Sequence, residues 1–319
     1  MNVLVTSISK KVPMLQMVKT SLTKFSDNSK LYGADANENV IGRFFVDHFW
    51  QMPPHDSLEL ETLISYCLSH RIEAIIPTRD GELLFFAQHK KRLAEENIFV
   101  MVSSLDAVKM CIDKFLFYVT GKKRGYPVIQ TSLEHIDISS SEFVVKERFG
   151  AGADKIGIQL TADEVVAYGK RLFLPIYQPY IKGEEYSVDL YITQNNVVKG
   201  AIARKREFVQ HGESQITTAV PYRELEDMCI QFVTDFKLTG HIVMQVIVDA
   251  KGNFHIVECN PRFGGASTLS VSLGLDSFYW FFSEVKGRDV DVPFVRTEES
   301  KTMVRFPKDL VFEAIEVKE

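Results

Sequence analysis

The chain has 319 residues, of which 45% are hydrophobic, 25% charged and 11% aromatic, and its formal net charge is −5. This composition is typical of a globular protein of about two domains, and no long basic stretch indicates a nucleic-acid-binding surface. The first apolar run covers only residues 3–5 and no later run approaches a membrane span, so we expect neither a signal peptide nor a membrane anchor.

The four cysteines are far apart in the sequence and form no CxxC pair. Their spacing therefore predicts neither a zinc site nor a disulfide framework, and free, buried thiols are expected instead. This cysteine usage is typical of a cytoplasmic protein. The residues concerned are Cys67, Cys111, Cys229 and Cys259.

Short apolar runs alternate with amphipathic stretches over the first hundred residues. Strands are predicted at 3–5, 30–35, 74–77 and 98–102, and helices at 13–22, 58–70 and 82–96. This β-α-β-α order predicts a parallel sheet covered by helices. Arg79 and Asp80 follow the third predicted strand, at the end where open α/β sheets place ligands, so they are candidates for an acceptor pocket.

A glycine-rich loop at 149–157 follows a predicted strand at 143–146. Glycines let backbone N–H groups approach phosphate oxygens, and Lys146 at the end of the strand would supply a positive charge for the same group. A plain turn is an equally good interpretation of the loop, and the segment is not a Walker A motif because no Gly-Lys-Ser/Thr follows. Thr161 is the predicted N-cap of the next helix, with Glu164 completing a capping box.

From residue 174 onwards the pattern predicts mostly strands, at 176–180, 186–192, 197–203, 242–248 and 254–257, with a hairpin turn at 249–252. We expect breaks near residues 105 and 180. The chain is thus divided into three lobes, 1–105, 106–180 and 181–319.

The strongest chemical signal lies in that hairpin. Strand side chains alternate between faces, so Glu258, Asn260 and Arg262 are predicted on one face, Cys259 on the other, and Gln245 on the partner strand. Oxygen ligands of this kind suit Mg²⁺, and a neighbouring arginine can neutralise charge on a phosphoryl group in transfer. The alternative is a solvated hairpin whose polar residues face water.

Taken in this order, the segments resemble the ATP-grasp superfamily and are most similar to the carbamoyl-phosphate synthase large-subunit branch, here as a single unit. The resemblance implies an α/β and α+β fold, with a Rossmann-like pre-ATP-grasp domain followed by a two-lobed ATP-grasp domain. It implies metal binding by Gln245, Glu258 and Asn260, and a position for Arg262 beside the transferred phosphate. Gln245 and Glu258 would also contact the nucleotide. The other implied nucleotide contacts are Lys114, Lys146, Gly150, Ala151, Gly152, Gln178, Pro179, Tyr180, Ile181 and Glu185.

Residues 209–221 resemble the family's segment near the acceptor substrate. The candidates there are His211, Glu213 and Ser214, together with Arg204, which follows the strand predicted at 197–203.

The function expected from this resemblance is an ADP-forming ligase that uses ATP with Mg²⁺, or Mn²⁺, to join a carboxylate to an amine. One alternative is a carbamoyl-phosphate-synthase-like half enzyme that acts on bicarbonate with a partner subunit. Another is a regulatory protein that binds ATP without turnover. A dehydrogenase is disfavoured because residues 7–13 lack the GxGxxG fingerprint. Small-molecule substrates are the expected partners, and the resemblance also implies a homodimer.

Overall fold

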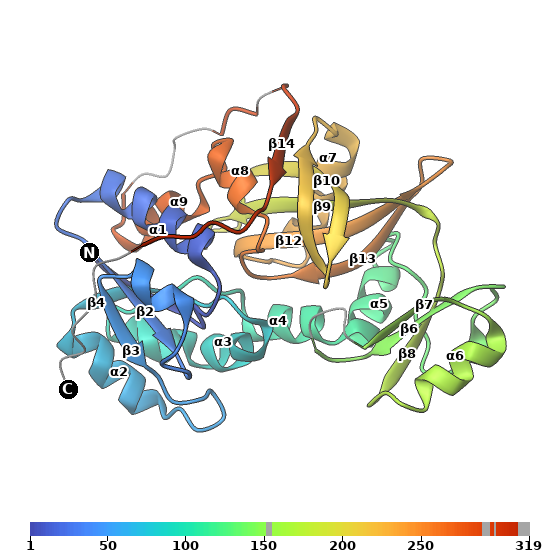
Figure 1. Cartoon of the computed structure of the whole chain (residues 1–319), viewed down its shortest axis with the longest axis horizontal. Helices are drawn as coiled ribbons and strands as arrows, with labels where there is room; N and C mark the ends of the chain where they lie inside the picture. Colours follow the sequence, from blue (N-terminus) through green and yellow to red (C-terminus); the bar gives the residue numbers. More distant parts are fainter. Residues whose placement is uncertain (151–154, 289–293, 297, 312–319) are drawn as a thin grey trace.

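A computed structural model describes residues 1–150, 155–288, 294–296 and 298–311. Three β-sheets organise this part of the chain. Figure 1 shows a parallel sheet near the N-terminus, a small sheet formed by β6 to β8, and a large antiparallel sheet that lies over both. Among these residues, no helix combines the length and the apolar character needed to cross a membrane.

The N-terminal sheet contains five parallel strands in the order β3-β2-β1-β4-β5. The predicted alternation of strands and helices is confirmed, but β3 was not predicted because it is a short strand at the edge of the sheet. The elements are β1 (Asn2–Thr6), α1 (Val12–Phe25), β2 (Lys30–Asp35), the 3₁₀ helix η1 (Ile41–Phe45), β3 (His48–Gln51), α2 (Leu60–Ser69), β4 (Ile72–Ile76), α3 (Asp80–Glu95) and β5 (Phe99–Val100).

The order of these strands creates a switch point. The chain places β2 and β3 on one side of β1, and then returns to place β4 and β5 on the other side. The loops that leave β1 and β4 therefore run in opposite directions and open a crevice at the carboxyl ends of the strands.

Two consecutive helices lead from this sheet to the small sheet. Ser104 caps α4 (Leu105–Ile112), and Asp113 caps α5 (Lys114–Lys123) by accepting hydrogen bonds from the N–H groups of Phe115 and Leu116. Neither helix was predicted from the sequence.

The small sheet is antiparallel, in the order β7-β6-β8. The predicted capping box of its helix is confirmed, because Glu164 N–H donates to Thr161 Oγ1 at 3.4 Å and Thr161 N–H donates to Glu164 Oε2 at 2.8 Å. The elements are the 3₁₀ helix η2 (His135–Asp137), β6 (Phe143–Glu147), β7 (Ile156–Leu160), α6 (Ala162–Gly169) and β8 (Pro175–Pro179).

The large sheet contains six strands in the order β13-β12-β9-β10-β11-β14. Strands β10 and β13 are longer than predicted, and β11, β14 and all three helices of this region were not predicted. The elements are β9 (Gly183–Ile192), β10 (Val198–Gln210), β11 (Glu213–Ala219), α7 (Arg223–Asp235), β12 (Gly240–Asp249), β13 (Phe254–Asn260), α8 (Thr268–Ser272), α9 (Ser277–Val285) and β14 (Lys301–Val304).

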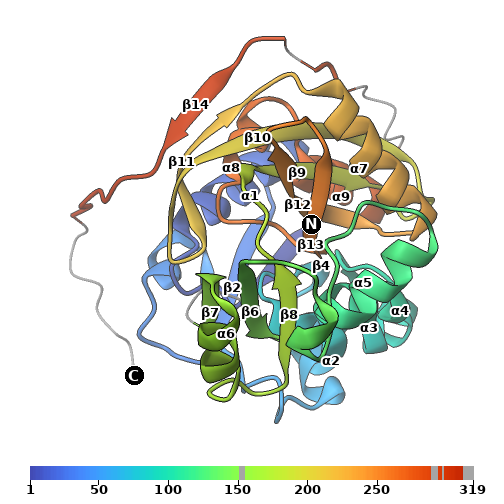
Figure 2. The same cartoon turned by 90° about the vertical axis from the view of Figure 1, so that its right-hand side faces the viewer.

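The two faces of the large sheet have different partners. Apolar residues of α4 and α7 pack with one face in a common core that includes Cys111 and Cys259. All four cysteines are free and buried, as predicted. Helices α1, α8 and α9 contribute to a core on part of the opposite face. Figure 2 shows the small sheet below the large one.

Candidate functional site

Polar side chains cluster where β12 pairs with β13. Gln245 lies opposite Glu258, and a β-bulge between Gln245 and Val246 leaves Val257 without a direct partner. Bulges of this kind commonly re-aim side chains beside active sites. Asn260 Nδ2 donates to Glu258 Oε1 at 2.8 Å, so these two side chains lie together, as the strand alternation predicted.

Arg262 connects this hairpin to the N-terminal domain. Its Nε and Nη2 atoms donate to the two carboxylate oxygens of Asp80 at 2.7 and 2.6 Å. Asp80 is the first residue of α3, and the Arg262 side chain keeps 19% of its surface exposed. Burial tends to lower the pKa of Arg262, but Asp80 and then Glu258 outweigh this effect and raise it. The guanidinium is therefore fully charged and held in one orientation.

Lys146 on β6 is a buried cation, with 8% of its surface exposed. Burial lowers the pKa of Lys146 to about 8; the charge of Glu258 opposes this shift, and the charge of Lys114 adds to it. Within the described residues, no hydrogen bond or ion pair from its ammonium is recorded. Lys114, at the start of α5, donates from Nζ to the carbonyl of Gly150 at 2.8 Å. The structure thus brings both predicted lysines towards Glu258.

The edge of β8 presents backbone groups of Pro179 and Ile181, two of the implied nucleotide contacts. Tyr180 N–H donates to the Glu142 carbonyl at 2.9 Å, so residue 180 points its backbone groups towards β6. In an antiparallel ladder the flanking residues point the other way. The carbonyl of Pro179 and the N–H of Ile181 therefore share the outer edge with Tyr177, whose backbone bonds a neighbouring loop at 2.9 and 3.0 Å. Among the described residues, no hydrogen bond from Ile181 N–H is recorded.

Other predicted nucleotide contacts stand differently. Gln178 is buried and its Nε2 donates to Thr131 Oγ1 at 2.8 Å, and the same alternation turns its backbone groups towards Val144 of β6, so neither its side chain nor its backbone faces the outer edge. Gly150 has a left-handed φ of 102°, which favours glycine at this position. Ala151 and Gly152 lie outside the described residues.

Arg206 joins the site, although the sequence analysis did not select it. Its Nε lies 3.4 Å from a carboxylate oxygen of Glu185, one of the implied nucleotide contacts, and its side chain is 6% exposed. Burial lowers the pKa of Arg206, with Glu185 and Glu258 acting in the opposite direction. Arg206 lies on β10 with the spacing i, i+2 from Arg204, and that shared face was the available signal.

The expectation for Arg204 is corrected by the structure. This side chain is 2% exposed and forms a bidentate pair with Asp189, which is completely buried. Ser267 and Ser270 donate to the same carboxylate. Arg204 lies under the loop that leads into α8, so its guanidinium faces the protein interior and not the surface of the site.

The segment expected near the acceptor is only partly assembled. Glu213 Oε2 accepts from Arg305 Nη1 at 2.6 Å, and it lies 3.5 Å from the position that a Cβ on Gly265 would take, in the loop after Arg262. His211 lies in the exposed turn between β10 and β11, and Ser214 is buried.

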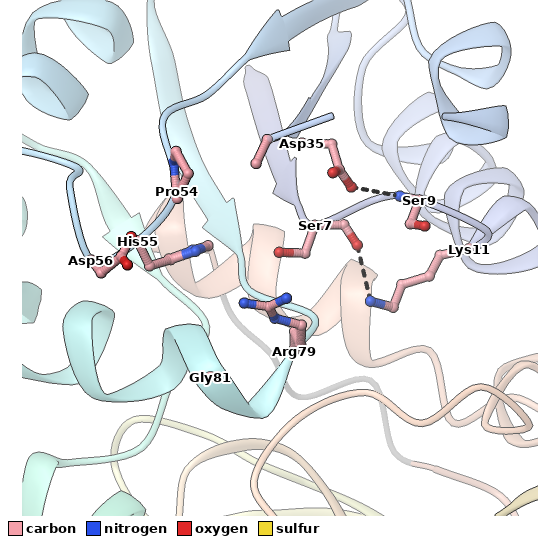
Figure 3. A pocket seen from close by; sticks show the side chains of 10 residues that line it. Ser7, Ser9, Lys11, Asp35, Pro54, His55, Asp56, Arg79 and Gly81 are labelled. Carbon is pink, nitrogen blue, oxygen red and sulfur yellow. Dashed lines mark hydrogen bonds between the residues drawn. The ribbon is translucent and has the colours of Figure 1, made fainter. Parts of the chain in front are cut away.

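A cavity of about 640 Å³ lies on the other side of Asp80, at the carboxyl edge of the N-terminal sheet. Arg79 was predicted to shape a pocket here and does line this cavity (Figure 3). Lys11, His55 and Asp35 also line it and were not predicted, because only the strand order brings their loops together.

The donor set on the hairpin fits a hard divalent cation. No group of three or more His, Cys, Asp or Glu side chains in the described part of the chain could hold a metal by itself. Mg²⁺ rarely needs such a cage, because it is usually held by one or two carboxylates together with substrate phosphates. Glu258 with the amide oxygens of Asn260 and Gln245 would meet this requirement if phosphate oxygens completed the shell.

Comparisons with known proteins agree with this geometry. A family described as "ATP-grasp in the biosynthetic pathway with Ter operon" matches residues 175–306, and the "PylC-like, N-terminal domain" family matches residues 3–101. Comparison with curated protein sequences gave no match.

Solved structures resemble the chain over almost its whole length. Biotin carboxylase from Campylobacter jejuni has a TM-score of 0.76 at 14% identity, with 95% of this chain and 75% of that one covered. N5-carboxyaminoimidazole synthetase from Staphylococcus aureus, complexed with ADP, has a TM-score of 0.74 at 17% identity, with 96% and 82% covered. The biotin carboxylase domain of the Hydrogenobacter thermophilus 2-oxoglutarate carboxylase, with MgADP and bicarbonate, has a TM-score of 0.74 at 14% identity, with 95% and 74% covered. The TM-scores show that the chain shares the fold of these enzymes, and the two family matches identify an ATP-grasp region at residues 175–306 and a PylC-like N-terminal domain at residues 3–101.

Proposed function

We propose that the chain is an ADP-forming ligase that activates a carboxylate with ATP and Mg²⁺ and joins it to an amine. The observation that carries this proposal is the ammonium of Lys146. It is buried, it has no recorded partner in the described residues, and it lies within electrostatic range of Glu258. A buried cation without a counter-ion is costly unless an anion completes the site, and a triphosphate would do so.

The nucleotide would lie between the small and the large sheet. The carbonyl of Pro179 and the N–H of Ile181 would bind the adenine edge, and Glu185 would accept hydrogen bonds from the ribose. Lys114 and Lys146 would hold the phosphate oxygens. The similar solved structures with bound ADP support this placement at the level of the fold.

In the proposed reaction a substrate carboxylate oxygen attacks the γ-phosphorus, and the bond to the β–γ bridging oxygen breaks as ADP leaves. Arg262, already oriented by Asp80, would face the phosphoryl group and stabilise its charge during transfer. Mg²⁺, held by Glu258, Asn260 and Gln245, supplies further charge neutralisation when bound. The amine nitrogen then attacks the acyl carbon, loses a proton and displaces phosphate.

Bicarbonate is the second candidate for the activated carboxylate. One of the similar structures contains MgADP and bicarbonate, and the same arrangement of cations could hold so small an anion. This is the chemistry of the half-enzyme alternative. The third alternative, a regulatory protein, predicts nucleotide binding without turnover.

The decisive experiment is ADP release from Mg-ATP across amino acids, hydroxy acids and bicarbonate, each with and without amine acceptors. Turnover that needs one acid and one amine supports the ligase, whereas turnover with bicarbonate alone supports the second candidate. Glu258→Gln and Lys146→Met should abolish turnover and stabilisation by Mg-ADP. Lys251→Met, in the exposed turn of the same hairpin, is the matched control and should change neither. Confirmed nucleotide binding with no turnover across the panel would count against catalysis.

We also propose the division into lobes at 1–105, 106–180 and 181–319, and a homodimer as the assembly. Limited proteolysis would test the first, through cleavage near residues 105 and 180. Sedimentation analysis would test the second.

A further inference from the structure

The cavity in the N-terminal domain lies where an open α/β sheet is expected to bind a ligand. Its walls come from the loops that follow β1, β2, β3 and β4, and β1 and β4 are the strands on either side of the switch point (Figure 3). Its volume of about 640 Å³ falls within the range of about 300–1,000 Å³ that is usual for small-molecule sites. Position and size therefore both indicate a binding pocket.

The buried carboxylate of Glu82 holds the walls of this cavity in place. Arg79 N–H donates to its Oε1 at 2.9 Å, and Thr78 N–H donates to the same oxygen. Ser7 Oγ donates to its Oε2 at 2.7 Å, and His55 Nε2 lies 2.8 Å from that oxygen. The loops after β1, β3 and β4 thus share one anchor. Since Glu82 is completely buried and used by these contacts, it is not a ligand-binding group itself.

Two cations line the cavity without acidic partners. Lys11 Nζ donates to the Ser7 carbonyl at 2.9 Å and to Thr78 Oγ1 at 2.8 Å, so one of its three donors is left over. In the described chain, no carboxylate lies within 4.0 Å of the charged nitrogens of Lys11 or Arg79. Figure 3 shows both side chains at the cavity, where they come from different loops. An anionic group of a bound ligand would supply the acidic partner that Lys11 and Arg79 lack.

Acidic side chains line the same cavity. Asp35 Oδ2 accepts from Ser9 N–H at 2.9 Å and its Oδ1 accepts from Asn37 N–H at 3.2 Å, which leaves part of its accepting capacity unused. Asp56 is exposed, and no ion pair from it is recorded among the described residues. A dianion would be repelled by these carboxylates, and a simple amine would leave the two cations unpaired. A ligand with one negative and one positive group can pair with both the cations and the carboxylates of the cavity.

The cavity is also joined to the phosphate site. Arg79 is followed by Asp80, which holds Arg262 by two hydrogen bonds. The charge of Arg262 in turn acts on Lys11. A carboxylate bound by Lys11 and Arg79 would therefore lie on the side of the cavity that faces the arginine of phosphoryl transfer.

We propose that this cavity binds the carboxylate substrate and that this substrate is an amino acid. Its carboxylate is held by Lys11 and Arg79 on the side of Arg262, and its ammonium is held by Asp35 and Asp56. The role of the amino acid as the activated substrate rests on the proposed ligase function, whereas its binding does not.

The test is titration calorimetry on the full chain, first without nucleotide and then with Mg-ADP. The probes are the proteinogenic amino acids with their D-enantiomers, and succinate, inorganic phosphate and ethanolamine as single-sign controls. At least one amino acid should bind. Arg79→Gln and Asp56→Asn should each weaken that binding at least tenfold, while Mg-ADP affinity stays within twofold. Both side chains are exposed, so these variants should fold; Lys91→Gln on the surface of α3 is the matched control and should change neither affinity.

Several results would overturn the proposal. These are no binding by any amino acid, tighter binding of succinate or phosphate than of every amino acid, or amino-acid affinity unchanged in both variants. Failure of the ligase proposal is separate, because it appears as no ADP release with any acid and amine of the panel, and the amino-acid titration without nucleotide can still succeed.

Discussion

Removal of the carboxylate of Asp189 should be among the most destabilising single changes in this chain. Asp189 is completely buried, and Arg204 Nε and Nη2 donate to its two oxygens at 2.5 and 3.1 Å. Ser267 Oγ donates at 2.6 Å, Ser270 Oγ donates as well, and His241 Nε2 lies 3.5 Å away. The carboxylate is therefore the common acceptor of a buried network between the large sheet and the loop that leads into α8.

The expected magnitude follows from what Asp189→Ala leaves behind. Arg204 cannot lose its proton at accessible pH, so it stays charged and buried without a counter-ion. Removal of one partner of a buried pair costs about 3–5 kcal/mol, against a total free energy of unfolding of about 5–15 kcal/mol for a typical protein. Replacement of both Asp189 and Arg204 by leucine should cost less than the sum of the single changes, because no unpaired charge then remains.

The assay is urea unfolding followed by tryptophan fluorescence and by circular dichroism. Two probes are needed because a chain with several lobes can unfold in more than one step. Asp27→Asn, in an exposed turn, is the control and should show only the small change typical of surface substitutions. A loss below about 1 kcal/mol for Asp189→Ala would refute the reasoning, since that is less than the lower bound expected for a broken buried pair.

The pH dependence has a definite sign. Burial tends to raise the pKa of Asp189, but Arg204 and His241 outweigh it and hold the pKa well below its usual range. A lowered carboxylate pKa contributes stability that is fully present above the unfolded value of about 3.9 and is lost as the pH falls below it. Asp189→Ala should therefore flatten the acid limb of the stability curve.

Three further predictions concern the site. The affinity for Mg-ADP should fall as the pH rises through about 8, where Lys146 loses its proton, and this slope should be absent in Lys146→Met; calorimetry at several pH values would show it. Asp80→Asn should lower the rate of ADP release at least tenfold, because Arg262 loses the carboxylate that orients it, while the affinity for Mg-ADP stays within twofold. An equal loss of turnover rate and of Mg-ADP affinity would indicate a general structural role for Asp80. Gly183→Ala should destabilise by about 1–3 kcal/mol in urea unfolding, since its Cβ would lie 2.3 Å from the Val248 carbonyl oxygen; an unchanged midpoint would contradict this.

The sequence predicted the elements whose signal is local. The N-terminal alternation, the hairpin of β12 and β13 and the capping box of Thr161 each depend on neighbours within a few residues. Helix α7 was missed although its signal was present, because its buried Leu225, Cys229, Phe232 and Val233 follow the spacing i, i+4, i+7, i+8. Strand β3 had no such signal, since four residues at a sheet edge, none of them buried, produce no readable period.

The candidate site was predictable to the extent that it lies on one hairpin. Glu258 and Asn260 share a face because strand side chains alternate, and that rule needs no tertiary information. The same rule places Arg204 and Arg206 on one face of β10, but their environments differ because a distant loop covers Arg204 and leaves Arg206 beside Glu185. The place of Lys11 in a pocket depends even more on tertiary structure, since that pocket forms only through the strand order of the N-terminal sheet.

The pair of Asp80 and Arg262 explains how two such distant segments form one site. Asp80 opens α3 at the edge of the N-terminal cavity, and Arg262 follows the strand that carries Glu258. An arginine that had to find its orientation during each reaction would lose part of its stabilising effect to reorganisation, whereas one fixed beforehand by a bidentate carboxylate does not. The partial exposure of this pair, 19% and 17%, keeps its desolvation cost below that of the buried Asp189–Arg204 pair and leaves the guanidinium open to an anion on the cleft side. A single ion pair can thus orient the phosphoryl-binding arginine and link the nucleotide cleft to the N-terminal cavity.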